Sequence, residues 1–130
     1  MHDAVVLDSS AVLALLRGES GSERVAGMVP GAALCVVNLA EVLTVLERNG
    51  VPAADAARSV ELLALRPVDA DETLARSAAG IAGAARGRGA GLSLGDAFCL
   101  ATGKTLGLPV VTADRAWEKL GIGVKVVVIR

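Results

Sequence analysis

Short runs of consecutive apolar residues alternate along the chain with longer stretches in which apolar residues recur every three or four positions. The short runs predict buried β-strands, and the longer stretches predict amphipathic helices. The predicted strands span residues 4–7, 33–37, 66–69, 109–112 and 124–129. The predicted helices span residues 9–18, 20–29, 38–50, 52–65, 71–86, 93–107 and 113–121. Apolar strands that alternate with helices indicate a parallel sheet covered on both faces.

The chain has 130 residues and no internal repeat, linker or low-complexity tail, so we expect a single domain over residues 1–130. The run 66–69 contains Pro67, which favours an edge strand because proline lacks a backbone N–H. Hydrophobic residues make up 53% of the chain and aromatic residues only 2%. The expected fold class is therefore α/β, with a core built from aliphatic side chains.

Acidic side chains follow several of the predicted strands. Asp8 comes directly after the first strand, Glu41 lies shortly after the second, and Asp114 lies two residues after the strand 109–112. Asp96 lies in the first turn of a predicted helix that must run antiparallel to the strand after it. Because the carboxyl ends of parallel strands share one edge of a sheet, we expect the four acids to meet there.

Each acid also has a purely structural interpretation. Asp8 and Asp114 each precede a predicted helix, where aspartate is a favoured N-cap. The segments NLAE (38–41) and SLGD (93–96) match the capping box, in which the fourth residue hydrogen-bonds back to the first. The first of these segments predicts Asn38 as the N-cap of the helix that follows it.

Taken together, the acids favour a metal site. Asp96 shares a helix face with Cys99, Leu100 and Gly103, so its side chain is expected to point inward. Neighbouring carboxylates repel one another, and a divalent cation relieves that repulsion. All-oxygen ligands suit Mg²⁺ or Mn²⁺, and such ions activate water and stabilise the leaving oxygen when a phosphodiester is hydrolysed.

Charge, aromatic content and cysteine usage narrow the function classes. The 14 acidic and 13 basic residues leave a formal net charge of −1, whereas proteins that hold nucleic acid through bulk charge are usually basic. The scarcity of aromatic side chains argues against tight single-strand binding by base stacking. Cys35 and Cys99 lie in apolar runs and form no C-x-x-C pair, so we expect two buried, reduced thiols.

The N-terminal stretch MHDAVVLDSS contains two acids and no long apolar run, so no signal peptide is expected. No run of about 20 apolar residues predicts a membrane span. These features, with the reduced cysteines, favour a cytoplasmic protein.

The segments VVLDSSAVLALL, NLAEVL, GLSLGDAFCLATGKTLGLPVVTADRAW and VKVVVI, in this order, resemble a PIN domain. More specifically, they resemble the toxin ribonucleases of bacterial VapBC toxin–antitoxin pairs, and the likeness covers essentially the whole chain. It implies a PIN-like three-layer α/β/α sandwich with a five-stranded parallel sheet in the order 3-2-1-4-5. It also implies an endoribonuclease that depends on Mg²⁺ or Mn²⁺.

The same resemblance assigns roles to individual residues. The catalytic acids would be Asp8, Glu41, Asp96 and Asp114. Asp8 and Asp96 would be metal ligands, and Asp114 would join them directly or through water. Glu41 would orient the attacking water or hold a second metal. Three polar residues are expected to support the acids, namely Ser10, Asn38 and Thr112.

The resemblance also implies partners. Such toxins form homodimers, and an antitoxin segment covers the active-site groove and presents an arginine to the carboxylates, a pairing that suits the charges. The helices within 38–65 are a candidate dimer surface. The candidate RNA contacts are Arg86 and Arg88, in the glycine-rich loop 86–91, and Arg115. The alternative for these arginines is a solvated surface charge.

Two other functions fit parts of the pattern. A non-catalytic α/β binding module would use the acidic edge to hold a metal or a basic partner peptide. A phosphotransfer domain of the receiver or haloacid-dehalogenase type also places an aspartate after the first strand. However, LDSS has no second aspartate two residues after Asp8, and Arg115 rather than lysine follows Asp114. The phosphotransfer alternative is therefore disfavoured, while the binding module stays open.

Overall fold

The computed structural model describes residues 4–130, and these form a five-stranded, all-parallel sheet in the order β3-β2-β1-β4-β5. The strands are β1 (Val6–Leu7), β2 (Ala33–Cys35), β3 (Arg66–Val68), β4 (Val110–Thr112) and β5 (Val126–Val128). The predicted fold class and strand order are confirmed. Residues 1–3, part of the stretch for which no signal peptide is expected, lie outside the described range.

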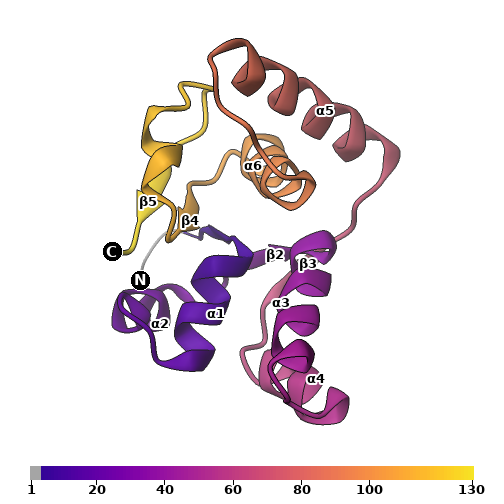
Figure 1. Ribbon diagram of the computed structural model, residues 1–130, viewed down its shortest axis with the longest axis vertical. Coiled ribbons are helices and arrows are strands. Elements are labelled where there is room, and N and C mark those ends of the chain that lie inside the picture. The colour runs from indigo at the N-terminus through magenta and orange to yellow at the C-terminus, as the bar shows by residue number, and fades with distance from the viewer. Residues whose placement is uncertain (1–3) are drawn as a thin grey trace.

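Helices cover both faces of the sheet, with α5 and α6 on one side and α1 to α4 on the other (Figure 1). Their bounds are α1 (Ser9–Arg17), α2 (Ser22–Met28), α3 (Val36–Arg48), α4 (Ala53–Glu61), α5 (Glu72–Gly87) and α6 (Leu94–Leu106). A short 3₁₀ helix, η1 (Arg115–Lys119), follows β4. The arrangement is a three-layer α/β/α sandwich, as expected.

The sheet separates two hydrophobic clusters, because alternate residues of a strand point to opposite faces. Leu7 packs with side chains of α1 to α4, whereas its neighbour Val6 packs with side chains of α5 and α6. The buried residues are almost all aliphatic, and burying each Val, Leu or Ile side chain contributes about 1.5–3 kcal/mol. Cys35 and Cys99 are both free and buried, as expected for structural thiols.

The start of α3 differs from the prediction. Strand β2 ends at Cys35, which is also the N-cap residue of α3, so the strand does not reach residue 37 and Asn38 is not the cap. Starting the helix at Val36 places Asn38 inside its first turn, where the side chain is 1% exposed. The predicted capping box over 38–41 is therefore wrong, and the Asn38 amide is free to bond elsewhere.

Two other helices depart from their predicted extent. Helix α4 ends at Glu61 rather than near residue 65, and Ala64 just beyond it adopts a left-handed conformation with a φ of 51°. The short helix predicted over 113–121 is present as the 3₁₀ helix η1 and covers only Arg115–Lys119. Within residues 4–130, no helix is long and apolar enough to cross a membrane.

Candidate active site

The four predicted acids lie along the edge of the sheet where the strands end. Asp8 directly follows β1, and Asp114 lies two residues beyond β4, which pairs in parallel with β1. Glu41 lies in the second turn of α3, the helix that leaves β2, and Asp96 lies in the first turn of α6. The structure thus brings together acids that are more than 100 residues apart in the chain, as Asp8 and Asp114 are.

Asp8 is 5% exposed, and both of its carboxylate oxygens accept hydrogen bonds. Oδ1 accepts from the Ser10 hydroxyl at 2.7 Å and from the Ala11 backbone N–H at 2.8 Å. Oδ2 accepts from the Thr112 hydroxyl at 2.6 Å. The bond from Ala11 makes Asp8 the N-cap of α1, so its predicted capping role is confirmed alongside its place at the strand edge.

Burial dominates the ionisation of Asp8. Loss of water around the carboxyl raises its pKa from 3.8 to about 6, and the hydrogen bonds from Thr112, Ser10 and Ala11 oppose that rise. The negative charge of Asp96 raises it further. A buried carboxylate of this kind is stabilised by a nearby cation.

Hydroxyl groups connect Asp8 to the end of β4. The Ser10 hydroxyl accepts a bond from the Ala113 N–H at 2.9 Å, and the fully buried Thr112 hydroxyl accepts one from the Asp114 N–H at 3.0 Å. The Asp114 carboxylate in turn accepts from the Ala116 N–H at 2.9 Å and caps η1. The backbone that carries Asp114 is thereby held against Asp8.

Asp96 forms the predicted capping box with Ser93. The Asp96 N–H donates to the Ser93 hydroxyl at 3.1 Å, and the Ser93 N–H donates to Asp96 Oδ2 at 3.3 Å. Burial raises the pKa of Asp96, the bonds from Ser93 lower it, and the charges of Glu41 and Asp114 raise it. Asp96 is therefore both the N3 partner of Ser93 in the capping box and an acid whose ionisation responds to two of the others.

Glu41 is held by Asn38, one helical turn earlier in α3. Asn38 Nδ2 donates to Glu41 Oε1 at 2.8 Å and to the Gly95 carbonyl oxygen of α6 at 3.0 Å. Asn38 Oδ1 is buried and has no hydrogen-bond partner among the described residues. One side chain thus ties the acid of α3 to the turn of α6 that carries Asp96.

None of the four acids forms an ion pair in the part of the chain that the structure describes. The ion pairs there join Glu19 with Arg17 and Arg130, and Glu72 with Arg76. Across residues 4–130, no three His, Cys, Asp or Glu side chains are arranged to hold a metal ion. The carboxylate and hydroxyl oxygens nevertheless match a hard divalent ion, since Mg²⁺ usually takes one or two carboxylates and completes its shell with water.

The thiol of Cys99 lies on the same face of α6 as Asp96 and is completely buried. Burial raises its pKa well above 9.0, and the charges of Asp8, Cys35, Asp96 and Glu41 act in the same direction. The thiol therefore stays protonated, and it packs as a small apolar group.

Two of the three predicted RNA-contact arginines bond to backbone carbonyls. Arg88 Nη1 donates to the Leu120 oxygen at 2.7 Å and also to the Gly121 oxygen. Arg115 Nε donates to the Arg130 oxygen at 2.8 Å. Arg86 is exposed on the last turn of α5. These bonds give Arg88 and Arg115 structural roles that the sequence did not indicate.

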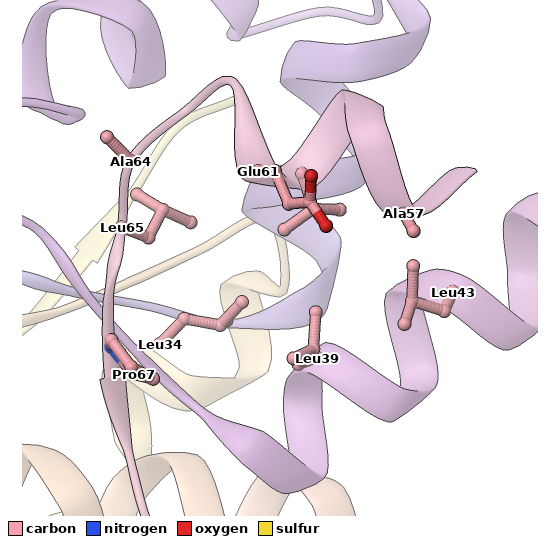
Figure 2. A pocket seen from close by; sticks show the side chains of 9 residues that line it. Leu34, Leu39, Leu43, Ala57, Glu61, Ala64, Leu65 and Pro67 are labelled. Carbon is pink, nitrogen blue, oxygen red and sulfur yellow. The ribbon is translucent and has the colours of Figure 1, made fainter. Parts of the chain in front are cut away.

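An apolar pocket of about 360 Å³ opens between α3, α4 and the strands β2 and β3 (Figure 2). Glu61 is the charged residue among those that line it; the others are Leu34, Leu39, Leu43, Ala57, Val60, Ala64, Leu65 and Pro67. The four acids do not line this pocket, which lies on the helices predicted as a dimer surface.

Sequence reasoning missed one residue of the site, Gly95. This glycine precedes Asp96, its carbonyl accepts the bond from Asn38, and its Cα faces the carboxyl group of Glu41. The available signal was a glycine in the first turn of a helix, a position where its low helix propensity is a disadvantage.

The fold and site define a class: a parallel α/β/α sandwich whose strand ends gather acidic side chains. A family model for the PIN domain matches residues 5–123, so the chain belongs to the PIN domain family. A comparison with curated proteins finds no match.

Solved structures show the same fold. A DNA-bound VapBC from Salmonella typhimurium is 19% identical, with 100% of both chains covered and a TM-score of 0.77. VapBC-5 from Mycobacterium tuberculosis is 27% identical, with 98% of both chains covered and a TM-score of 0.68. VapC20 from Mycobacterium tuberculosis, described as a sarcin-ricin loop cleaving toxin, is 19% identical over 90% of this chain and 95% of its own, with a TM-score of 0.72.

Proposed function

We propose that the chain is a metal-dependent endoribonuclease, a single PIN-like domain over residues 1–130, and the toxin of a toxin–antitoxin pair. The observation that carries this proposal is the burial of Asp8 near three further acids, with no ion pair to offset their charge among the described residues. Membership of the PIN domain family supports it, as does the likeness to VapBC complexes and to VapC20.

Asp8 and Asp96 would hold Mg²⁺ or Mn²⁺, and Asp114 would join them directly or through water. When bound, the cation would polarise the scissile phosphoryl group and lower the pKa of a coordinated water. Glu41, held by Asn38 on α3, would orient the attacking water toward phosphorus. The products would be two RNA fragments separated at the hydrolysed phosphodiester.

The neighbouring polar residues would position these acids. Ser10 and Thr112 each donate a hydroxyl hydrogen bond to Asp8, one to each carboxylate oxygen, and so restrict its rotation. Asn38 does the same for Glu41 from inside α3. Such fixed geometry lowers the barrier because the reacting groups need not be ordered during the reaction.

Replacing Asp8 by asparagine tests this proposal. Asp8→Asn keeps the size and the helix-capping ability of the side chain but removes its charge, so RNA cleavage in Mg²⁺ or Mn²⁺ should be abolished while the protein stays folded. Cleavage of total RNA by the purified protein, with EDTA added in parallel, measures the activity. Asp71→Asn is the matched control, because Asp71 caps α5 in the same way and lies outside the site.

Melting in the presence of Mn²⁺ supplies a second measurement. An ion that binds only the folded protein raises its melting temperature, so Mn²⁺ should stabilise the wild type and Asp71→Asn more than Asp8→Asn. Full metal-dependent cleavage by a pure Asp8→Asn preparation would overturn the mechanism.

A non-catalytic binding module is the second candidate function, and one observation favours it. Each of the four acids accepts a local hydrogen bond, and residues 4–130 contain no ready-made group of three metal-ligating side chains. A wild-type protein that binds Mn²⁺ or a basic peptide but leaves RNA intact would support this candidate instead.

The proposed partners are RNA, an antitoxin and a second copy of the chain. Complexes named VapBC are among the similar structures, which supports an antitoxin whose segment covers the acids and presents an arginine to them. The apolar pocket on α3 and α4 supports a protein-binding surface on the helices within 38–65 (Figure 2).

Arg86, with Arg88 and Arg115 in lesser roles, would contact the RNA backbone. Arg86 is exposed and donates no such bond within residues 4–130, whereas Arg88 and Arg115 each donate a hydrogen bond to a backbone carbonyl oxygen. The buried free thiols Cys35 and Cys99 support a reducing, cytoplasmic location.

A further inference from the structure

We propose that Gly95 is a positioning residue for Glu41: the absence of a side chain at Gly95 lets the Glu41 carboxylate lie against the first turn of α6, beside Asp96. This inference rests on the proposed nuclease function, since it concerns the acid that would orient the attacking water.

The two helices meet at a buried amide. Asn38, 1% exposed, donates from Nδ2 both to Glu41 Oε1 at 2.8 Å and to the Gly95 carbonyl at 3.0 Å. The same nitrogen therefore sets how far the Glu41 carboxylate lies from the backbone of α6.

The absence of a side chain at Gly95 leaves the space that the Glu41 carboxylate occupies. A Cβ added there would overlap the whole carboxyl group of Glu41, namely Cδ, Oε1 and Oε2. The Glu41 carboxyl group is the far end of a flexible side chain, so a methyl group at position 95 would displace the carboxylate and leave the backbone in place.

The backbone conformation does not itself require glycine here. Gly95 lies within α6 and has no positive φ, and alanine is the better helix former. Another glycine of α6 acts differently: Gly103, near the far end of the helix, allows α6 to pack closely on Val110 at the start of β4. The close approach of the Glu41 carboxylate is thus the structural reason for a glycine at position 95.

The position of the carboxylate has an electrostatic consequence. With Glu41 resting on the residue before Asp96, the two negative charges interact, and Glu41 contributes to the raised pKa of Asp96. Moving the Glu41 carboxylate away would increase its distance from the other carboxylates without removing any of the four acids.

The test compares Gly95→Ala with Gly80→Ala. Gly80 lies inside α5 with open space around it, so it is a matched control for adding a methyl group to a helical glycine. We expect both variants to melt at or above the wild-type temperature. Gly80→Ala should cleave RNA like the wild type, whereas Gly95→Ala should lose on the order of 10²-fold in kcat with KM for RNA unchanged.

The side-chain amide of Asn38 gives a readout that does not depend on activity. In an NMR spectrum of the wild type, its two amide protons should be shifted by their bonds to Glu41 and Gly95, and Gly95→Ala should move one of them. Gly80→Ala should move neither. Unchanged Asn38 resonances in Gly95→Ala would overturn the inference.

The double variant Gly95→Ala with Glu41→Ala keeps the inference testable even if Gly95→Ala alone does not fold. If Gly95→Ala unfolds because its methyl group meets Glu41, removing that carboxylate should restore the melting temperature to that of Glu41→Ala. A double variant that stays unfolded would place the clash elsewhere and overturn the inference. If Gly95→Ala folds, its effect on kcat should disappear in the Glu41→Ala background.

The outcomes separate this inference from the proposed function. An inactive wild type refutes the nuclease proposal, and the Asn38 resonances then decide whether Gly95 places the carboxylate. An active wild type with a fully active Gly95→Ala refutes the positioning role alone.

Discussion

Asp8, Asp96 and Asp114 each accept a hydrogen bond from a backbone N–H near the start of a helix, and each also lies at the carboxyl edge of the sheet. The capping and clustering interpretations of these acids are therefore compatible. An alanine at any of these positions would remove a capping hydrogen bond together with a charge, at a cost of about 1 kcal/mol for the capping bond alone. Asparagine removes only the charge and is the better probe.

The raised pKa of Asp8 predicts how metal-free stability depends on pH. Because the folded protein binds this proton more tightly than the unfolded chain, stability should fall as the pH rises from about 4 to about 6. Above that range, the buried charge costs about 3 kcal/mol, a value that follows from a rise from 3.8 to about 6.

Urea denaturation in EDTA measures this effect. Asp8→Asn should be more stable than the wild type near pH 7.5, and the difference should shrink toward zero below a pH of about 3, where the carboxyl is protonated in both states. A difference between the two proteins that is the same at every pH would contradict the assignment of the shift to Asp8.

At the scale of the elements, most strands were predictable because they are short apolar runs bounded by polar residues, and β3 because its proline suits an edge strand. The strand order followed instead from the resemblance to PIN domains. The start of α3 was not predictable in this way. Two β-branched residues, Val36 and Val37, extend the apolar run of β2, and Asn38 then resembles a helix cap. Tertiary contact decides otherwise: the buried bond from Asn38 to the Gly95 carbonyl requires Asn38 to face α6.

The four acids of the candidate site could be placed at one edge of the sheet from the sequence, because the polarity of the strands and the direction of the connecting helices carry that information. Their distances could not be predicted. The close approach of Glu41 to Gly95 depends on how α3 and α6 pack, and the bond from Thr112 to Asp8 depends on the register of β1 with β4. Both are long-range features that no local pattern encodes.

The loop between α5 and α6 yields a prediction about stability. Arg88 ties this loop to the segment after η1 through two backbone carbonyls, so Arg88→Ala should lower the free energy of unfolding by about 1 kcal/mol. Arg86→Ala, two residues earlier and exposed, is the matched control and should change stability little. Chemical denaturation compares the two, and equal stabilities would show that the Arg88 bonds contribute nothing.

For the molecule as a whole, the near-zero net charge limits how RNA can be held. With a formal net charge of −1 and acids gathered at one edge, few phosphate contacts are available, so RNA binding should depend only weakly on salt. Loss of a single phosphate contact should therefore produce a measurable change in this weak salt dependence.

Arg86→Ala tests one such contact. If Arg86 meets a phosphate, its loss should reduce the slope of log affinity against log salt concentration by about one unit. The measurement uses the Asp8→Asn background, in which RNA should stay intact. Arg58→Ala on the exposed face of α4 is the control, and an unchanged slope in Arg86→Ala would make Arg86 a solvated charge.

Trp117 is the sole tryptophan of a chain without tyrosine, and it is 3% exposed in the core beneath η1. Its backbone N–H donates to the carbonyl oxygen of Asp114 at 3.2 Å. Near-ultraviolet absorption and intrinsic fluorescence therefore come almost entirely from one indole ring, three residues from a candidate metal ligand. The protein carries its own optical reporter, through which cation binding or the docking of a partner over the acids can be followed in real time without a label.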